Sequence, residues 1–157
     1  MLTWKEFTEA RPDLAEAGRG LLYQWDVGLA FLGTVRKDGG PRMHPMCPVI
    51  VDGGLYAFIE PGPKRHDLLR DGRYALHCFP PANNEDAFYV TGLAKARTDA
   101  ELIAAAQSVF WSERGKDEPP EPASTLALFE FLIGTCLLTR TTGHGDWNPQ
   151  HTIWKAP

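Results

Sequence analysis

The residues with the clearest chemical potential follow a rigid corner in the middle of the chain. The stretch FIEPGPKRHDLLRDGRYALHCF, residues 58–79, places Lys64 directly after Pro61-Gly62-Pro63 and at the expected start of a short helix. A helix N-terminus offers unpaired N–H groups and the positive end of the helix dipole, so an ammonium group there completes a binding site for phosphate. Considered alone, the corner favours the alternative of a lysine on a solvated surface helix.

Basic residues gather around this corner although the whole chain is acidic. The formal net charge is −4, which argues against a nucleic-acid-binding protein because such proteins present a basic face. Residues 36–73 contain seven basic and five acidic side chains, a local charge of +2, and the remaining residues carry −6. A mildly positive middle suits a small anionic ligand better than a polymer, with chance clustering as the alternative.

The histidines and cysteines show no metal-binding spacing. The five histidines lack HxH and HExxH patterns, and the three cysteines (Cys47, Cys78, Cys136) contain no CxxC pair, so no metal site is expected. An odd number of widely spaced cysteines indicates reduced thiols in a cytoplasmic protein. P-loop, GxSxG and GxGxxG motifs are also absent from the sequence, and no catalytic residue is assigned.

The chain of 157 residues fits a single domain without a membrane segment, because no apolar run approaches the ~20 residues that a spanning helix needs. An N-terminal helical arm is predicted over residues 1–25. Thr3-x-x-Glu6 forms a capping box for its first helix, and Pro12 interrupts that helix. Asp13 is the expected cap of a second helix that runs to about Tyr23. Core strands are predicted over residues 27–98, and a helix with the closing strands over residues 99–157.

Six principal strands are expected. Residues 27–37, 41–51 and 55–59 predict three strands in a meander, joined by two Asp-Gly-Gly turns. The second strand contains three prolines, each of which removes a ladder donor, so it must lie at an edge or bulge and leave backbone carbonyls free. The other strands are predicted at residues 73–79, 87–97 and 133–141, with a short final one at 151–155.

Three helical or connecting segments complete the pattern. A short helix is predicted over residues 64–71, and a longer one capped by Asp99 runs to Ser112. A polar connector at 113–122 and a brief link at 126–131 follow. Many short strands with few helices indicate an α+β, mainly β fold built around an antiparallel barrel.

Several small motifs occur in a fixed order between residues 27 and 98. The Asp38-Gly39-Gly40-Pro41 turn precedes Lys64-Arg65-His66-Asp67-Leu68 and the pair Asp71-Gly72. In this order the segment resembles the split-barrel flavin-binding family related to pyridoxamine 5′-phosphate oxidase. The resemblance implies a six-stranded antiparallel split β-barrel and a homodimer. It also implies FMN bound at the dimer interface with its phosphate near Lys64.

The resemblance also implies which residues contact the coenzyme. The segment after the first turn runs along the flavin in that family, the third strand contacts the ligand, and the corner approaches the phosphate. The implied cofactor-binding residues are Arg42, His44, Pro45, Met46, Cys47, Pro48, Val49, Phe58, Ile59, Pro63, Lys64 and Arg65.

Departures from the family pattern change the expected substrate. His44 holds the place of an arginine, and Gly62-Pro63 stand where the oxidases have Ser-Arg. The sequence TTGHGDWNPQ replaces the arginine–histidine substrate motif near the C-terminus. We therefore expect an oxidoreductase that transfers hydride through flavin N5 and acts on a small molecule other than pyridoxamine phosphate.

Two alternatives remain at this stage. One is an F420 (deazaflavin)-dependent reductase of the same fold, for which Arg36, Lys37 and Arg65 are the only further basic residues near the site. The other is a non-enzymatic flavin or haem carrier. In a haem carrier the axial ligand would be one of three histidines: His44, His66 or His144.

Overall fold

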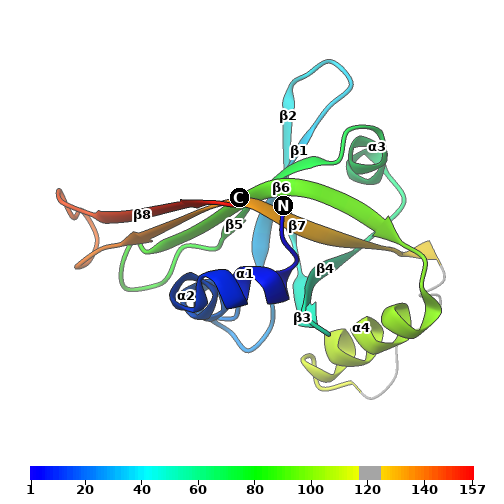
Figure 1. Ribbon diagram of the computed structural model, residues 1–157, viewed down its shortest axis with the longest axis horizontal. Coiled ribbons are helices and arrows are strands. Elements are labelled where there is room, and N and C mark those ends of the chain that lie inside the picture. Colours follow the sequence, from blue (N-terminus) through cyan, green and yellow to red (C-terminus); the bar gives the residue numbers. More distant parts are fainter. Residues whose placement is uncertain (117–124) are drawn as a thin grey trace.

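A computed structural model describes residues 1–116 and 125–157 of the 157-residue chain. From residue 117 onward, the predicted polar connector lies outside the described residues. Figure 1 shows the course of the chain through the described helices and strands. The helices are α1 (Trp4–Ala10), α2 (Pro12–Leu22), α3 (Pro63–Arg70) and α4 (Ala100–Ser112). The strands are β1 (Ala30–Val35), β2 (Pro41–Met46), β3 (Pro48–Val51), β4 (Gly54–Ile59), β5 (Arg73–Cys78), β6 (Ala87–Arg97), β7 (Ala127–Arg140) and β8 (Gln150–Lys155).

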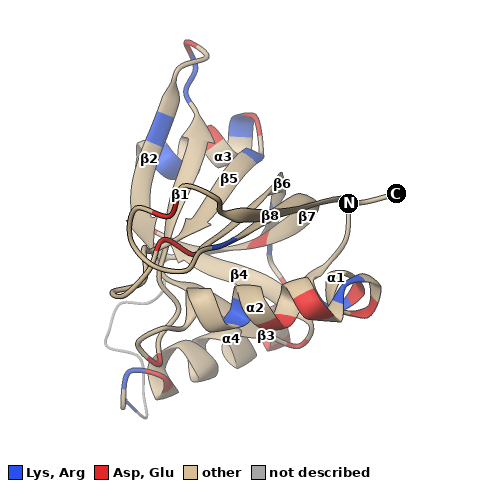
Figure 2. Cartoon of the chain, turned by 90° about the vertical axis from the view of Figure 1, so that its left-hand side faces the viewer, with Lys and Arg blue, Asp and Glu red and all other residues tan. Residues whose placement is uncertain are grey.

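The strands form one antiparallel sheet in the order β2-β1-β5-β6-β7-β4-β3, with β8 pairing β7. The long strands β6 and β7 pair along nearly their whole length and join the two halves of the sheet. The sheet curls into a half-barrel, and the β1–β2 hairpin stands out from it beside α3 (Figure 1). Basic residues lie on this hairpin and on α3 (Figure 2). The mainly β fold with peripheral helices agrees with the coarse prediction.

The predicted second strand and the predicted meander were wrong in detail. The proline-rich second strand is two strands, β2 and β3, which separate at Cys47 and lie at opposite ends of the sheet. Both are edge strands, as expected for segments in which proline removes ladder donors. Because β2 pairs only with β1 and β3 only with β4, the first three predicted strands do not form a meander. In the described residues the sheet therefore has eight strands, where six principal strands and a short final one were predicted.

The predicted link at residues 126–131 is also a strand. It forms the first half of β7, where Glu130 lies opposite Tyr56 of β4 and opposite Lys95 of β6. Pairing on both sides makes this segment a central part of the sheet. The second half of β7 then pairs with β8 instead of β4.

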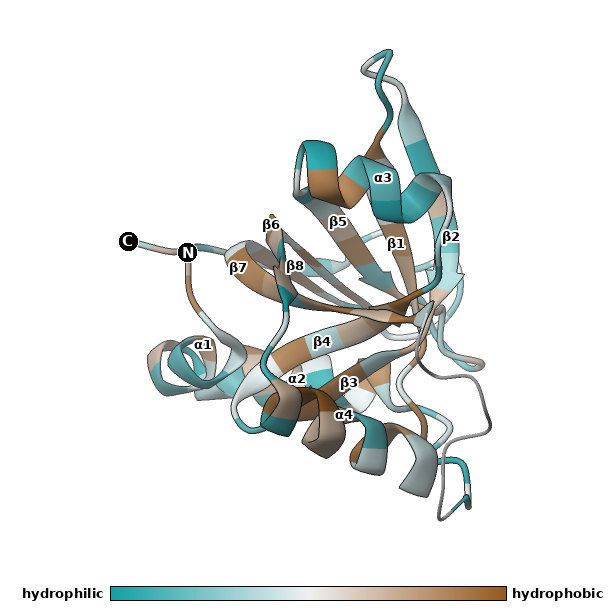
Figure 3. Cartoon of the chain, turned by 90° about the vertical axis from the view of Figure 1, so that its right-hand side faces the viewer, coloured by the Kyte–Doolittle hydropathy of each residue, from teal (hydrophilic) through white to brown (hydrophobic). Residues whose placement is uncertain are grey.

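Apolar side chains fill the concave side of the sheet. The main cluster includes Phe7, Leu22, Phe88 and Phe131, all fully buried, and joins α1 and α2 to the sheet. A second, smaller cluster lies beneath α4 and contains Val49, Tyr56, Ala106 and Leu128. The inner strands and the facing side of α4 are accordingly hydrophobic (Figure 3).

The N-terminal arm forms as predicted. Thr3 Oγ1 accepts a hydrogen bond from the Glu6 backbone N–H at 3.3 Å, and the Glu6 carboxylate accepts one from the Thr3 backbone N–H at 2.8 Å. This capping box starts α1. The second helix begins earlier than predicted, at Pro12, so Asp13 lies inside its first turn and does not cap it. No helix in the described part of the chain has the length and apolarity required to cross a membrane.

Candidate functional site

The corner before α3 leaves the helix N-terminus open. Gly62 adopts φ 153° and ψ −175°, a conformation that side chains on Cβ disfavour, and a Cβ placed there would meet no atom within 4 Å. Pro63 occupies the first turn of α3, and no side chain caps this end of the helix. The N-terminal N–H groups of α3 are thus accessible to a ligand.

Lys64 follows directly and is half-buried. Burial lowers the pKa of its ammonium group, an effect that Glu60 and Cys47 partly oppose. Among residues 1–116 and 125–157, the ion pairs within 4.0 Å do not include Lys64. A partly desolvated cation without a carboxylate partner is disfavoured unless an anion binds to it.

His44 lies on β2, opposite Leu32 of β1. Its Nε2 atom is buried and has no hydrogen-bond partner in the part of the chain that the structure describes. Burial lowers the pKa of His44, the positive charges of Lys64 and Arg42 lower it further, and Asp67 acts in the opposite direction. The three basic side chains therefore share one electrostatic environment, in which the imidazole is neutral at pH 7.

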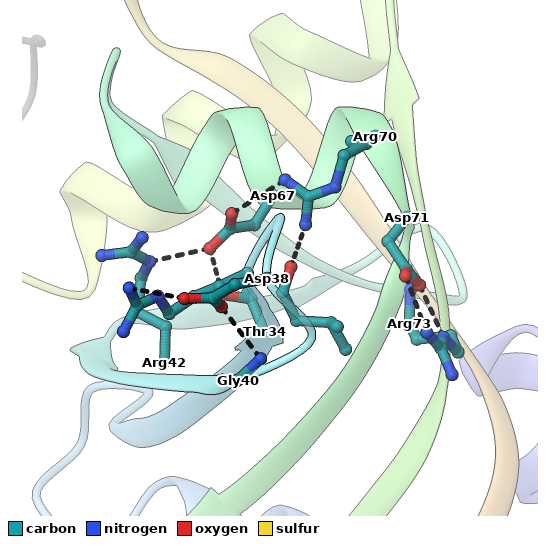
Figure 4. Close-up of polar contacts among 10 residues, drawn as sticks. Thr34, Asp38, Gly40, Arg42, Asp67, Arg70, Asp71 and Arg73 are labelled. Carbon is teal, nitrogen blue, oxygen red and sulfur yellow. Dashed lines mark hydrogen bonds and ion pairs between the residues drawn. The ribbon is translucent and has the colours of Figure 1, made fainter.

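The buried carboxylate of Asp67 holds Arg42, one of these three basic side chains, in place. Asp67 accepts hydrogen bonds from Arg42 Nε at 2.7 Å, Thr34 Oγ1 at 3.0 Å and Arg70 Nη1 at 3.2 Å (Figure 4). Its side chain is only 5% exposed. Burial alone would raise the pKa of Asp67, but the hydrogen bonds from its three partners outweigh burial and hold that pKa below its ordinary value. The carboxylate stays ionised and keeps Arg42 in place.

This network was missed in the sequence analysis, which considered Asp67 only as part of a motif. The spacing of three residues between Asp67 and Arg70 does indicate that both lie on the same side of a helix. In the structure this side of α3 faces β1 and β2. Arg70 also donates to the carbonyl oxygen of Val35 and so fastens α3 to the end of β1.

The remaining predicted cofactor residues occupy several environments. Met46 and Ile59 are buried in the main core. Val49 lies in the cluster beneath α4, and Phe58 packs against that cluster, with its ring edge-to-face with Phe110 at 5.8 Å. These four side chains support the elements around the site from within.

Four further predicted residues lie outside the apolar core. Pro45 is exposed on the outer face of β2, and Pro48 is buried at the start of β3. Between them, Cys47 is a half-buried free thiol. Arg65 donates to the backbone carbonyl of Thr125 at 2.9 Å. The charges of Lys64 and Arg42 both act on His44, and Arg42 lies beside Pro63 along one groove, so these residues form the candidate site.

Neither a protein-family model nor a curated protein sequence matches this chain. Solved structures do resemble it. A NimC/NimA family protein from Clostridium acetobutylicum has a TM-score of 0.65 and 15% identity, over 92% of this chain and 98% of that one. A protein from the same organism, related to general stress protein 26 and the pyridoxinephosphate oxidase family, has a TM-score of 0.60 and 13% identity, over 96% and 95%.

A haem-binding protein from Mycobacterium smegmatis is also similar, with a TM-score of 0.61 and 14% identity. The likeness covers 87% of this chain, which spans only 57% of that protein. At these identities the comparisons establish the fold, and it is the fold of proteins related to pyridoxamine 5′-phosphate oxidase.

Proposed function

We propose that this split-barrel protein binds FMN and acts as an oxidoreductase on a small molecule. The observation that carries the proposal is Lys64, a half-buried ammonium group at an uncapped helix N-terminus, with no carboxylate within 4.0 Å in the described residues. A phosphate bound there would neutralise the ammonium group and accept hydrogen bonds from the first N–H groups of α3.

The surrounding residues fit a phosphorylated flavin. Gly62 leaves open space on the approach to Lys64. Arg42, held by Asp67 through its Nε atom, supplies a second positive charge from β2. The neutral imidazole of His44 has one donor and one acceptor nitrogen, and its unpartnered Nε2 can form a hydrogen bond to the bound coenzyme.

In the proposed reaction the coenzyme carries the chemical step, and the protein binds and orients it. FMN, when bound, supplies hydride transfer at N5, a step that requires no strong acid or base from the protein. Lys64 and Arg42 hold and orient the anionic end, and their charge favours a negatively charged ligand over a neutral one. His44 fixes the position of the ligand through a single uncharged hydrogen bond.

The proposal includes a homodimer that encloses the coenzyme between two copies of the chain. The open side of the site and the exposed apolar residues on the adjacent surface, such as Met43 on β2, are in keeping with a partner surface. Sedimentation analysis should give twice the 17.5 kDa mass of the chain. A monomer that binds FMN would remove the dimer from the proposal and leave the coenzyme site in place.

Titration of the purified protein with FMN, F420 and haem in parallel tests the choice of ligand. We expect FMN to saturate at one molecule per chain, followed by the change in flavin fluorescence and visible absorbance. Saturation by F420 or haem, with no binding of FMN, would replace the proposed coenzyme while leaving the fold unchanged.

Haem binding is a second candidate because of His44. A neutral imidazole with an unpartnered Nε2 has the chemistry of an axial haem ligand. Lys64 and Arg42 are suitable partners for the carboxylates of haem, and a haem-binding protein shares the fold.

Replacing His44 with alanine separates the two candidates. If FMN is the ligand, we expect its affinity to fall by about 1 kcal/mol, or roughly fivefold, for the loss of one hydrogen bond. If haem is the ligand, the variant should lose the spectrum of histidine-ligated iron. Thermal stability should not fall in either case, because the Nε2 atom has no partner in the described protein. Unchanged binding of both ligands would remove His44 from the site.

A further inference from the structure

A second basic region lies on another side of α3. An open groove of about 650 Å³ separates the end of the β1–β2 hairpin from the helix. Its charged lining consists of Arg36, Lys37, Arg42 and Arg70 together with Asp38 and Asp67. Four permanently positive side chains face two carboxylates, so the groove carries a net charge of +2 within a protein of net charge −4.

Helix geometry separates this groove from the Lys64 site. The α3 residues that line it are Pro63, His66, Asp67 and Arg70, which share one face of the helix at i, i+3, i+4 and i+7. Lys64 is about 100° further round the helix from Pro63 and does not line the groove. Arg42, on β2, is the basic residue common to both sites.

The groove is organised by the buried carboxylate of Asp67. Arg42 binds Asp67 through Nε alone, so in the described structure its two terminal amino groups make no hydrogen bond to protein (Figure 4). Both terminal nitrogens of Arg70 donate hydrogen bonds, one to the carboxylate of Asp67 and the other to the backbone carbonyl of Val35. Because two guanidinium groups are already fixed, little side-chain entropy is lost when an anion binds between them.

The side chains that the β1–β2 hairpin contributes to the groove are exposed and can change their partners. Arg36 pairs with Asp38 at 2.9 Å, and both side chains are about half exposed or more. Such an exposed pair contributes little to stability, so an anion can replace the carboxylate of Asp38 at low cost. Lys37 is exposed and is absent from the ion pairs of the described residues.

We propose that this groove binds a small polyanion with two or more phosphate or carboxylate groups, independently of Lys64. A single phosphate would reach only part of a lining that extends from the hairpin to α3, whereas two linked anionic groups can contact Arg42 and the hairpin together. The anion is either a free molecule or the anionic part of a larger coenzyme.

Calorimetric titration with inorganic pyrophosphate at low salt tests the site without any flavin. In the Lys64→Ala variant, in which the phosphate site at the N-terminus of α3 is disabled, we expect one pyrophosphate per chain. The double variant Arg36→Gln, Lys37→Gln should bind it about tenfold more weakly. The exposed Lys155→Gln on β8 is the matched control and should bind it as the wild type does. The double variant and the control are compared in the same Lys64→Ala background, so that pyrophosphate bound at the N-terminus of α3 does not contribute to the difference; Lys64 itself does not line the groove.

Two outcomes would overturn the proposal. The first is that the double variant binds pyrophosphate as tightly as the protein that keeps Arg36 and Lys37. The second is that Lys64→Ala alone no longer binds pyrophosphate. A comparison of FMN with FAD, which has one more phosphate, identifies the source of the anion. If the double variant weakens FAD binding and spares FMN binding, the groove serves the extended part of a coenzyme.

Discussion

Replacing Lys64 with alanine is expected to weaken FMN binding by about 1.5–3 kcal/mol, or roughly 10- to 150-fold. The loss arises because Lys64 lies in the first turn of α3, whose N-terminus no side chain caps, and has no carboxylate within 4.0 Å in the described residues. Fluorescence titration of the wild type and the variant under the same salt conditions measures the difference. Salt matters because charge-mediated binding is screened.

The same variant should fold at least as stably as the wild type. Burial lowers the pKa of Lys64, which means that its surroundings disfavour the charged form. Removing an ammonium group from such a position does not break an ion pair. Lys155→Ala, an exposed lysine far from α3 in sequence, is the control for the loss of one positive charge. If Lys64→Ala binds FMN as tightly as the control does, Lys64 is an ordinary surface lysine.

Replacing Asp67 with asparagine should destabilise the protein by about 2–3 kcal/mol. Removing one partner of a fully buried ion pair destabilises a protein by more than this. The expected loss is smaller here because Arg42 and Arg70 are partly exposed to solvent, which screens the interaction. The variant leaves two guanidinium groups without their shared carboxylate. Urea unfolding at pH 7 measures the effect.

The effect of Asp67→Asn should depend on pH. Because the folded-state pKa of Asp67 is below its ordinary value of 3.8, its carboxylate contributes fully above that value, and the contribution is lost as the pH falls through the folded-state pKa. The stability difference between wild type and variant should therefore shrink in acid. Asp13→Asn, which removes an exposed carboxylate paired with Arg11, is the control and should change stability little. Equal unfolding free energies for both variants would show that the network does not stabilise the fold.

Local sequence signals were sufficient for most helices and turns. The capping box at Thr3 and the cap at Asp99 each act within one helical turn, and the structure places helix starts at both. The Asp-Gly-Gly turns likewise act locally, and Gly39 and Gly53 adopt φ of 83° and 76°. These features depend on neighbouring residues, which is why they are visible in the sequence.

Strand pairing was less visible because it depends on distant residues. Prolines correctly indicated edge strands, but the sequence did not show that the chain breaks at Cys47 and that β2 and β3 join opposite ends of the sheet. For the same reason the sequence predicts residues 126–131 only as a helical or extended link and does not decide between the two, whereas the structure has a strand there. Its stability comes from β4 and β6, and neither neighbour can be inferred from residues 126–131 alone.

The candidate site likewise combines features that depend on neighbouring residues with features that depend on distant ones. Lys64 and its open corner were identified from local sequence. The hydrogen bonds of Asp67 were not, because Thr34 and Arg42 lie 33 and 25 residues away. The break at Cys47 also interrupts the alternation of faces, so the positions of Met46 and Val49 in two different apolar clusters could not be derived from strand periodicity.

The central claim is that Lys64 and α3 recognise a phosphate on a flavin. Comparing FMN with riboflavin, which has the same ring system without the phosphate, tests this claim most directly. We expect the wild-type protein to bind one FMN per chain at least about tenfold more tightly than riboflavin, as a charge-assisted phosphate contact requires. Equal affinities for the two flavins, or no binding of either, would contradict the claim.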